Sequence, residues 1–252
     1  MGSGQVSTLT LVAVNGLGGL EHLWDGFRAA LPAPVELRVL DLPGHGDRPP
    51  ATDYRYAALV EDVLARTGDL EPFPLVGWSV GGAVAWLFAA RHPDRVTSLV
   101  LLDPAAPHQS RFKDGPTPEP VHPYTYASLE DARRALAPID PTVTDDDVRR
   151  LYRQDVRGRW EPRFDPAIFP ALVGDARDLG NAFRVELGAI LAPTLVVRGE
   201  RGLLPRADLD EVVAGIPGAR GATLRGAGHF MVREQPEQLS RLVLDFLQPA
   251  RS

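Results

Sequence analysis

The stretch Gly77-Trp78-Ser79-Val80-Gly81-Gly82 decides the fold. It lies between a short apolar run, Phe73 to Val76, and a helix-like run, Ala83 to Arg91. This fits the pattern G-x-S-x-G, in which a strand, a sharp turn and a helix raise a serine hydroxyl above the edge of a sheet. Glycines are needed there because neighbours without a Cβ let the backbone fold back and let a substrate approach. The order of the pieces predicts that Ser79 is a nucleophile.

Composition narrows the class of protein. The chain has 252 residues with 27 Lys and Arg against 33 Asp and Glu, a formal net charge of −6, which suits one α/β domain with an insertion. No basic stripe dominates, so we expect no nucleic-acid partner. The absence of cysteine excludes disulfides and thiol catalysis. We see no signal peptide and no apolar run of membrane-spanning length, so we expect a cytoplasmic protein without a membrane partner. Richness in Ala, Arg, Gly and Pro suggests a GC-rich bacterial gene.

Short apolar runs alternate with helical patterns, which is typical of a mostly parallel central sheet flanked by helices. The expected strands are Thr8 to Val14, Glu36 to Leu40, Leu75 to Val76, Val96 to Leu102, Thr194 to Val197 and Thr223 to Leu224. The expected helices are Leu20 to Leu31, Tyr54 to Thr67, Val80 to Arg91, Arg206 to Ala214 and Glu237 to Leu247.

The region 104–190 breaks this alternation. It opens with a proline-rich stretch and then carries two amphipathic, helix-like segments, Ser128 to Leu136 and Asp145 to Val156. Arg159 to Pro166 reads as an irregular connector. An insertion of this length between two strands predicts a helical lid. We therefore expect a core domain of residues 1–103 and 191–252, with a helical cap of residues 104–190.

Four separated motifs occur in one order along the chain: Asn15-Gly16-Leu17-Gly18-Gly19, Asp41-Leu42-Pro43-Gly44-His45-Gly46, the serine turn, and Gly226-Ala227-Gly228-His229. Arg91-His92-Pro93-Asp94-Arg95-Val96 follows the helix after the serine. Together they resemble the α/β-hydrolase fold family over nearly the whole chain. The resemblance implies a serine hydrolase of the kind found among lid-containing esterases and lactonases.

The resemblance assigns roles to single residues. Ser79 matches the nucleophile, and His229 matches the general base and acid that takes and returns the serine proton. The loop of Asn15 and Leu17 matches the oxyanion loop, with Asn15 in place of the usual histidine. The backbone N–H groups of Leu17 and Val80 would then form the oxyanion hole.

The acid of the expected triad is missing from its usual place. In the turn Gly199 to Pro205, Gly202 stands where the family carries an aspartate. Asp103, at the end of the apolar strand, is our first candidate, because haloalkane dehalogenases and certain lactonases take their acid from that strand end. Glu200 is the second candidate and Asp208 the third. The fourth alternative is that no acid exists and the site is a Ser–His dyad.

Other polar residues have structural interpretations. We expect His45 to order its glycine-rich loop and Asp41 to brace it. His22, His92, His108 and His122 lack metal-ligand spacing, so we expect no metal, and nothing implies a cofactor.

The expected pocket is apolar. Trp78, Phe230, Met231 and the lid residue Trp160 are the candidate substrate contacts, although Trp78 and Phe230 could equally be core. The predicted reaction is hydrolysis of a small apolar carboxylic ester or lactone through an acyl-serine. Thioester or C–C bond hydrolysis, and a non-hydrolytic isomerase, cyclase or ligand-binding protein on the same scaffold, stay open. The sequence is compatible with a monomer or a homodimer.

Overall fold

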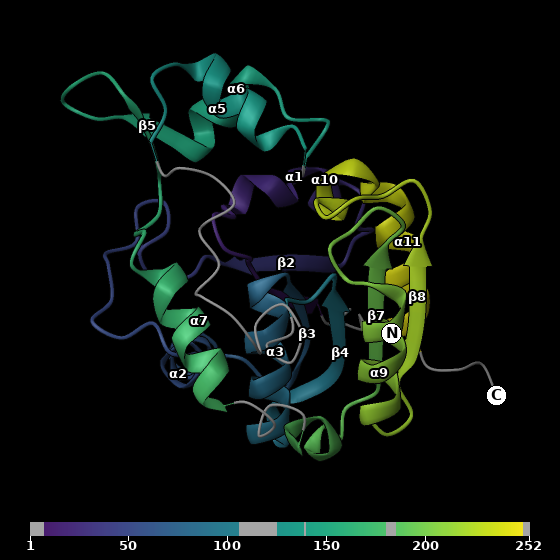
Figure 1. The fold of residues 1–252 in the computed structure, drawn as a ribbon. Helices are drawn as coiled ribbons and strands as arrows, with labels where there is room; N and C mark the ends of the chain where they lie inside the picture. Colours follow the sequence, from purple (N-terminus) through teal and green to yellow (C-terminus); the bar gives the residue numbers. More distant parts are fainter. Residues whose placement is uncertain (1–7, 106–124, 139, 180–184, 249–252) are drawn as a thin grey trace, which may run out of the picture.

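The computed structural model describes residues 8–105, 125–138, 140–179 and 185–248. Within these residues, six strands form a parallel sheet in the order β2-β1-β3-β4-β7-β8 (Figure 1). The strands are β1 (Leu9–Val14), β2 (Val35–Leu40), β3 (Phe73–Trp78), β4 (Val96–Leu102), β7 (Thr194–Gly199) and β8 (Arg220–Leu224). The expected fold class is confirmed, and β3 and β8 are longer than the sequence indicated.

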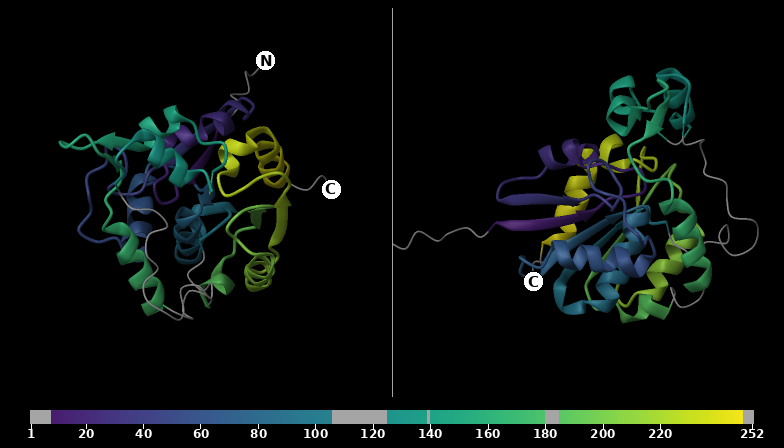
Figure 2. Two further views of the ribbon diagram at one scale, coloured as in Figure 1. Left: turned by 45° about the horizontal axis from the view of Figure 1, so that its top comes forward. Right: turned by 90° about the vertical axis from the view of Figure 1, so that its left-hand side faces the viewer.

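Helices cover both faces of this sheet (Figure 2). On one face lie α2 (Tyr56–Arg66), α3 (Val80–Arg91) and α9 (Arg206–Gly215), with side chains in one apolar cluster. On the other face lie η1 (Glu21–Trp24), α1 (Asp25–Ala29), α10 (Met231–Glu234) and α11 (Pro236–Leu247), which share a second cluster. The short helix η2 (Pro93–Arg95) leads into β4. Strands β3 and β4 are buried on both faces, which explains their almost continuous apolar sequences.

The strand order places the polar loops together. Strand β2 lies on one side of β1, and the next strand, β3, lies on its other side. The direction in which strands are added therefore reverses between β1 and β3. In parallel sheets the crevice at such a reversal, beyond the carboxyl ends of the strands, is the common ligand site. The loops after β1, β3, β4, β7 and β8 all leave the sheet at this edge.

The turn after β3 is strained and tightly packed. Ser79 has φ 56° and ψ −121°, and φ is positive at only one other described residue that is not glycine. A Cβ on Gly77 would lie 2.6 Å from the Cβ of Ala85, and a Cβ on Gly81 would overlap the carbonyl oxygens of Val14 and Asn15. The glycines therefore let α3 start directly against β3 and the loop after β1.

Part of the region between β4 and β7 forms a small cluster of its own. Helices α5 (Leu129–Leu136) and α6 (Asp145–Leu151) and a hairpin of β5 (Tyr152–Gln154) and β6 (Trp160–Pro162) share a separate apolar core, which stands apart from the sheet in Figure 2. The expected helix over Asp145 to Val156 is wrong after Leu151, and the expected irregular connector contains β6. Asp155 accepts hydrogen bonds from the backbone N–H of Arg157 and Arg159, and this turn closes the hairpin.

The rest of this region packs elsewhere. Helix α7 (Ile168–Leu179) buries Ile168, Leu172 and Ala176 in the main core beside α2, and η3 (Glu186–Ala189) follows. The described helices and strands of the expected cap, residues 104–190, thus pack in two clusters, and its role as one cap stays a prediction. Residues 106–124, most of its proline-rich opening, lie outside the described residues. None of the described helices is long and apolar enough to span a membrane.

The packing of the serine turn can be tested with two glycine substitutions. Gly81→Ala should lower the free energy of unfolding by more than about 3 kcal/mol, because its Cβ overlaps backbone oxygens that cannot move aside. Gly174→Ala is the matched control, since a Cβ there meets nothing within 4 Å in the middle of α7. It should raise the free energy of unfolding by about 0.5–1 kcal/mol. Urea unfolding measures both, and equal effects would contradict the packing described for the turn.

Candidate active site

Three of the predicted residues meet at the carboxyl edge of the sheet. The Nε2 atom of His229 lies 3.0 Å from the Oγ of Ser79, and its Nδ1 lies 2.6 Å from Oδ2 of Asp103. Ser79, His229 and Asp103 are 9%, 7% and 1% exposed. The imidazole therefore links the hydroxyl to the carboxylate, which is the geometry that Ser-His-Asp catalysis requires.

Asp103 is fixed by backbone donors as well as by His229. Its carboxylate accepts the N–H of Leu203 at 2.6 Å and that of Leu204 at 3.1 Å. Its own N–H donates to Val197 at 2.7 Å, and its φ is 41°. A Cβ on Gly202 would lie 2.5 Å from Oδ1 of Asp103, so the carboxylate occupies the space that a side chain at 202 would need.

The other two candidate acids lie elsewhere. Glu200 accepts the N–H of Gly226 at 2.8 Å, which ties the turn after β7 to the loop that carries His229. Asp208 lies in the first turn of α9. Of the carboxylates weighed from the sequence, Asp103 is the one that the structure brings to His229.

A carboxylate that sequence reasoning missed braces the histidine loop. Glu234, whose side chain is 2% exposed, accepts the N–H of Gly228 at 2.9 Å and that of Phe230 at 3.2 Å. It therefore holds the peptides on both sides of His229. Arg201 lies 3.2 Å from this carboxylate. The sequence carried a weak signal, since Glu234 falls in the first turn of α10, where a carboxylate can accept the N–H groups left free at the start of a helix.

The predicted oxyanion donors lie on either side of Ser79. Val80 opens α3, so its N–H is one of those that find no partner inside the helix. A Cβ on Gly16 would lie 2.8 Å from the Cβ of Ser79, which places the peptide leading to Leu17 directly beside the nucleophile. Gly16 and Val80 thus lie next to Ser79, and the oxyanion role of the Leu17 and Val80 N–H groups stays a prediction.

Polar side chains hold the start of the oxyanion loop. Asn15 is fully buried, donates to Asp41 at 2.7 Å and accepts from the indole N–H of Trp24 at 2.9 Å. Burial raises the pKa of Asp41, although the hydrogen bond from Asn15 opposes the shift. Asn15 thus forms hydrogen bonds at the position of the family's usual histidine, and Asp41 contacts the start of the oxyanion loop through it.

His45 is a second buried imidazole. Its Nε2 accepts the backbone N–H of Gly18 at 2.9 Å, and its Nδ1 lies 3.1 Å from the carbonyl oxygen of Pro43. Burial lowers the pKa of His45 from its ordinary value of 6.5 to about 4. The ring is therefore neutral at neutral pH, and the expected ordering role of His45 extends to the oxyanion loop.

The predicted substrate contacts divide into three groups. Trp78 is 1% exposed and donates its indole N–H to the His229 carbonyl at 2.8 Å, and Met231 is fully buried, so both belong to the core and not to a surface open to substrate. Phe230 is half-buried and packs at 5.1 Å on the Trp78 ring, next to the site. Trp160 packs on the α5–α6 cluster, and its contact with substrate stays a prediction.

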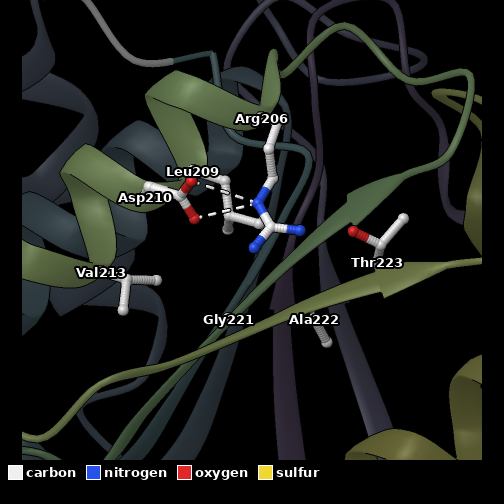
Figure 3. A pocket seen from close by; sticks show the side chains of 7 residues that line it. All are labelled: Arg206, Leu209, Asp210, Val213, Gly221, Ala222 and Thr223. Carbon is white, nitrogen blue, oxygen red and sulfur yellow. Dashed lines mark hydrogen bonds and ion pairs between the residues drawn. The ribbon is translucent and has the colours of Figure 1, made fainter.

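One surface pocket lies away from these residues. It has a volume of about 190 Å³ between α9 and β8, and the ion-paired Arg206 and Asp210 are among the side chains that line it (Figure 3). Both partners are more than half exposed, which makes this an ordinary surface pair. Among the residues that the structure describes, no three His, Asp or Glu side chains gather as a metal site.

Comparison with known proteins identifies the family. Residues 11–242 match the alpha/beta hydrolase family. The chain belongs to the alpha/beta hydrolase family. This α/β hydrolase is similar to monoacylglycerol lipase abhd6-B of Xenopus laevis, with 28% identity over 96% of the chain and 76% of the relative.

Two further relatives cover most of the chain. A pimeloyl-acyl carrier protein methyl ester esterase of Neisseria meningitidis is 27% identical over 93% of this chain and 91% of its own length. The solved structure of an esterase from Mycobacterium tuberculosis superposes with a TM-score of 0.74 at 25% identity, covering 96% of this chain and 84% of that one. These relatives are named as lipases or esterases, which act on esters.

The pKa of His45 gives a stability test. Between about pH 6.5 and pH 4, the unfolded chain binds a proton at residue 45 that the folded chain excludes, so stability falls as the pH falls through this window. The parent should lose about 3 kcal/mol more than His45→Gln, which cannot titrate, between about pH 7 and pH 4. Urea unfolding across this range measures the difference. Parallel curves for the two proteins would contradict a neutral, buried His45.

Proposed function

We propose that this α/β hydrolase cleaves an apolar carboxylic ester through an acyl-serine at Ser79. The observation that carries the proposal is the continuous contact from Ser79 through His229 to Asp103, at 3.0 and 2.6 Å. A serine hydroxyl is a weak nucleophile, and an imidazole within hydrogen-bond reach, itself oriented by a carboxylate, is the arrangement that activates it.

In the acylation half, His229 Nε2 takes the Ser79 proton as Oγ attacks the ester carbonyl carbon. The carbonyl oxygen gains negative charge, and the N–H groups of Leu17 and Val80 donate to it. Asp103 accepts the Nδ1–H of His229 and stabilises the imidazolium that forms. The C–O bond to the leaving group then breaks, His229 gives its proton to the departing alkoxide, and the alcohol leaves an acyl-Ser79.

In the deacylation half, water replaces the alcohol. His229 takes one proton from this water as its oxygen attacks the acyl carbon, and the same two N–H groups receive the oxyanion. The bond to Oγ breaks, and Ser79 recovers a proton from His229. The products are one carboxylic acid and one alcohol, and the site returns to its starting state without a cofactor.

Apolar side chains at the site support an apolar substrate. Phe230 and Leu17 are half-buried beside the machinery, and Leu203, in the loop that binds Asp103, is 40% exposed. Such surfaces favour uncharged acyl or alkyl groups. The relatives named as a lipase and as methyl ester esterases agree with an ester substrate. Lactone hydrolysis would use the same steps, with the leaving alkoxide tethered to the acyl group.

We propose that the cluster of α5, α6, β5 and β6 acts as a lid. Its link to the core supports this role, because Arg233 pairs with Asp147 at 2.6 Å and with Asp140 at 3.2 Å. Arg233 lies four residues after His229 and directly before Glu234, which braces the histidine loop. Because the cluster is anchored next to the loop that carries His229, it can influence which substrates reach Ser79.

The proposed reaction is tested with a fluorophosphonate probe and a panel of p-nitrophenyl esters, an acyl thioester and a γ-lactone. The parent should be labelled at Ser79 and hydrolyse the esters, whereas Ser79→Ala should do neither. Asp103→Asn should lower kcat/KM by about 10³- to 10⁴-fold, as loss of the orienting carboxylate does in serine proteases.

The matched control is Asp208→Asn, which changes a carboxylate in the first turn of α9 and should leave kcat/KM as in the parent. Folding of each variant is checked by urea unfolding. An unlabelled, inactive parent would favour the non-hydrolytic alternative. A parent that prefers the thioester or the lactone would redirect the proposal to that bond while keeping the acyl-serine.

A further inference from the structure

His45 has both ring nitrogens committed. Gly18 can only donate its backbone N–H, so Nε2 of His45 must be the unprotonated acceptor, at 2.9 Å. The proton then lies on Nδ1, where it faces the carbonyl oxygen of Pro43 at 3.1 Å. The side chain is fully buried. The structure therefore fixes one tautomer, with its acceptor directed at the oxyanion loop.

The bond to Gly18 holds the middle of a tight turn. Gly19 donates its N–H to the carbonyl of Gly16 at 3.0 Å, so Leu17 and Gly18 are the two central residues. Gly18 has φ +73°, the conformation that a type II turn requires at this position. The peptide between the central residues carries the Gly18 N–H. His45 therefore fixes the orientation of the peptide that follows Leu17.

Neighbouring segments keep the imidazole from turning. The ring of Phe164 stacks on it, with centroids 5.3 Å apart and planes 17° apart. The Phe164 segment is bound to the His45 loop on both sides, since Gly46 donates to the carbonyl of Arg163 at 2.7 Å and Asp165 donates to that of Gly44 at 2.8 Å. Nε2 of His45, which accepts the Gly18 N–H, is therefore held in one place.

We propose that His45 is a positioning residue for the oxyanion hole, which holds the Gly16–Gly19 turn so that the Leu17 N–H faces the carbonyl oxygen at Ser79. The inference rests on the proposed acyl-serine reaction and deepens it. Gly16 already lies against Ser79, so a small rotation of the turn redirects the Leu17 N–H without moving the nucleophile. Asn15 fixes the start of the loop, and His45 fixes the orientation of the peptide between Leu17 and Gly18.

This role predicts a particular kinetic signature. The negative charge on the carbonyl oxygen develops in the transition state, so a misdirected donor lowers kcat and leaves KM nearly unchanged. Loss of one oxyanion donor costs about 10²- to 10³-fold in kcat, and a displaced donor should cost about 10- to 100-fold. The inhibition constant of an alkyl trifluoromethyl ketone, whose adduct with Ser79 carries an oxyanion, should rise by the same factor.

The test compares three substitutions at residue 45 on the ester that the parent hydrolyses fastest. Gln places an amide oxygen near the position of Nε2 and should retain most of kcat. Asn carries the same amide one methylene shorter and cannot reach Gly18, so its kcat should fall about 10- to 100-fold. His45→Leu should behave as His45→Asn. Because Gln and Asn differ only in length, the comparison survives if the leucine variant does not fold.

The control is His92→Leu, at the end of α3, whose ring packs on Phe88 and which should retain the kinetic constants of the parent. Three outcomes would overturn the inference: Gln and Asn variants with equal kcat, a rise in KM at constant kcat, or a trifluoromethyl ketone that binds all variants equally. Fluorophosphonate labelling separates failure of the role of His45 from failure of the proposed acyl-serine reaction. A parent that labels and turns over while these outcomes appear defeats only the role of His45, whereas an inert parent defeats the reaction and the role together.

Discussion

A carboxylate buried at the end of a strand must be surrounded by donors, and Asp103 obtains them from two loops at once. Leu203 and Leu204 donate backbone N–H groups from the turn after β7, and His229 approaches from the loop after β8. Removing a charge from water costs several kcal/mol, so each of these donors is needed. The side chain reaches them because β4 lies between β3 and β7, and because Asp103 takes the left-handed conformation, φ 41°, that aspartate tolerates better than most residues. The space it fills is the space that a side chain at Gly202 would need.

Because the acid lies at the end of β4, the turn after β7 does not carry it and has a different role. Glu200 and Arg201 in that turn bind the backbone of Gly226, so they brace the histidine loop instead of polarising the imidazole. Glu234 braces the same loop from the other side. On the opposite side of the serine, Asn15 and His45 hold the oxyanion loop through neutral side chains. Carboxylates thus brace the loop that carries the base, and Asn15 and His45 present neutral groups to the loop of Leu17.

The sequence predicted the elements whose pattern is local. The apolar strands, the glycine-bounded serine and the helix that follows it could be read directly, since each depends on neighbours in the chain. The hairpin of β5 and β6 was missed because Asp155 and Gly158 form its turn inside a segment whose charges also suit a helix. Trp78 was ambiguous because residues beside a nucleophile alternate between site and core, and only the sheet shows which way each side chain points. The contacts of His45 with Gly18 and of Asp103 with His229 join residues 27 and 126 positions apart, and no local pattern encodes them.

The central claim, that Asp103 orients the His229 ring, is tested most directly by proton NMR of the Nδ1–H of His229. A short hydrogen bond from imidazole to carboxylate shifts this proton far downfield of the backbone amides, and His229→Gln identifies the signal by its loss. The account predicts that the signal is present in the parent, persists in Glu200→Gln and disappears in Asp103→Asn. A signal that survives Asp103→Asn and disappears in Glu200→Gln would contradict it and assign the acid to the turn after β7.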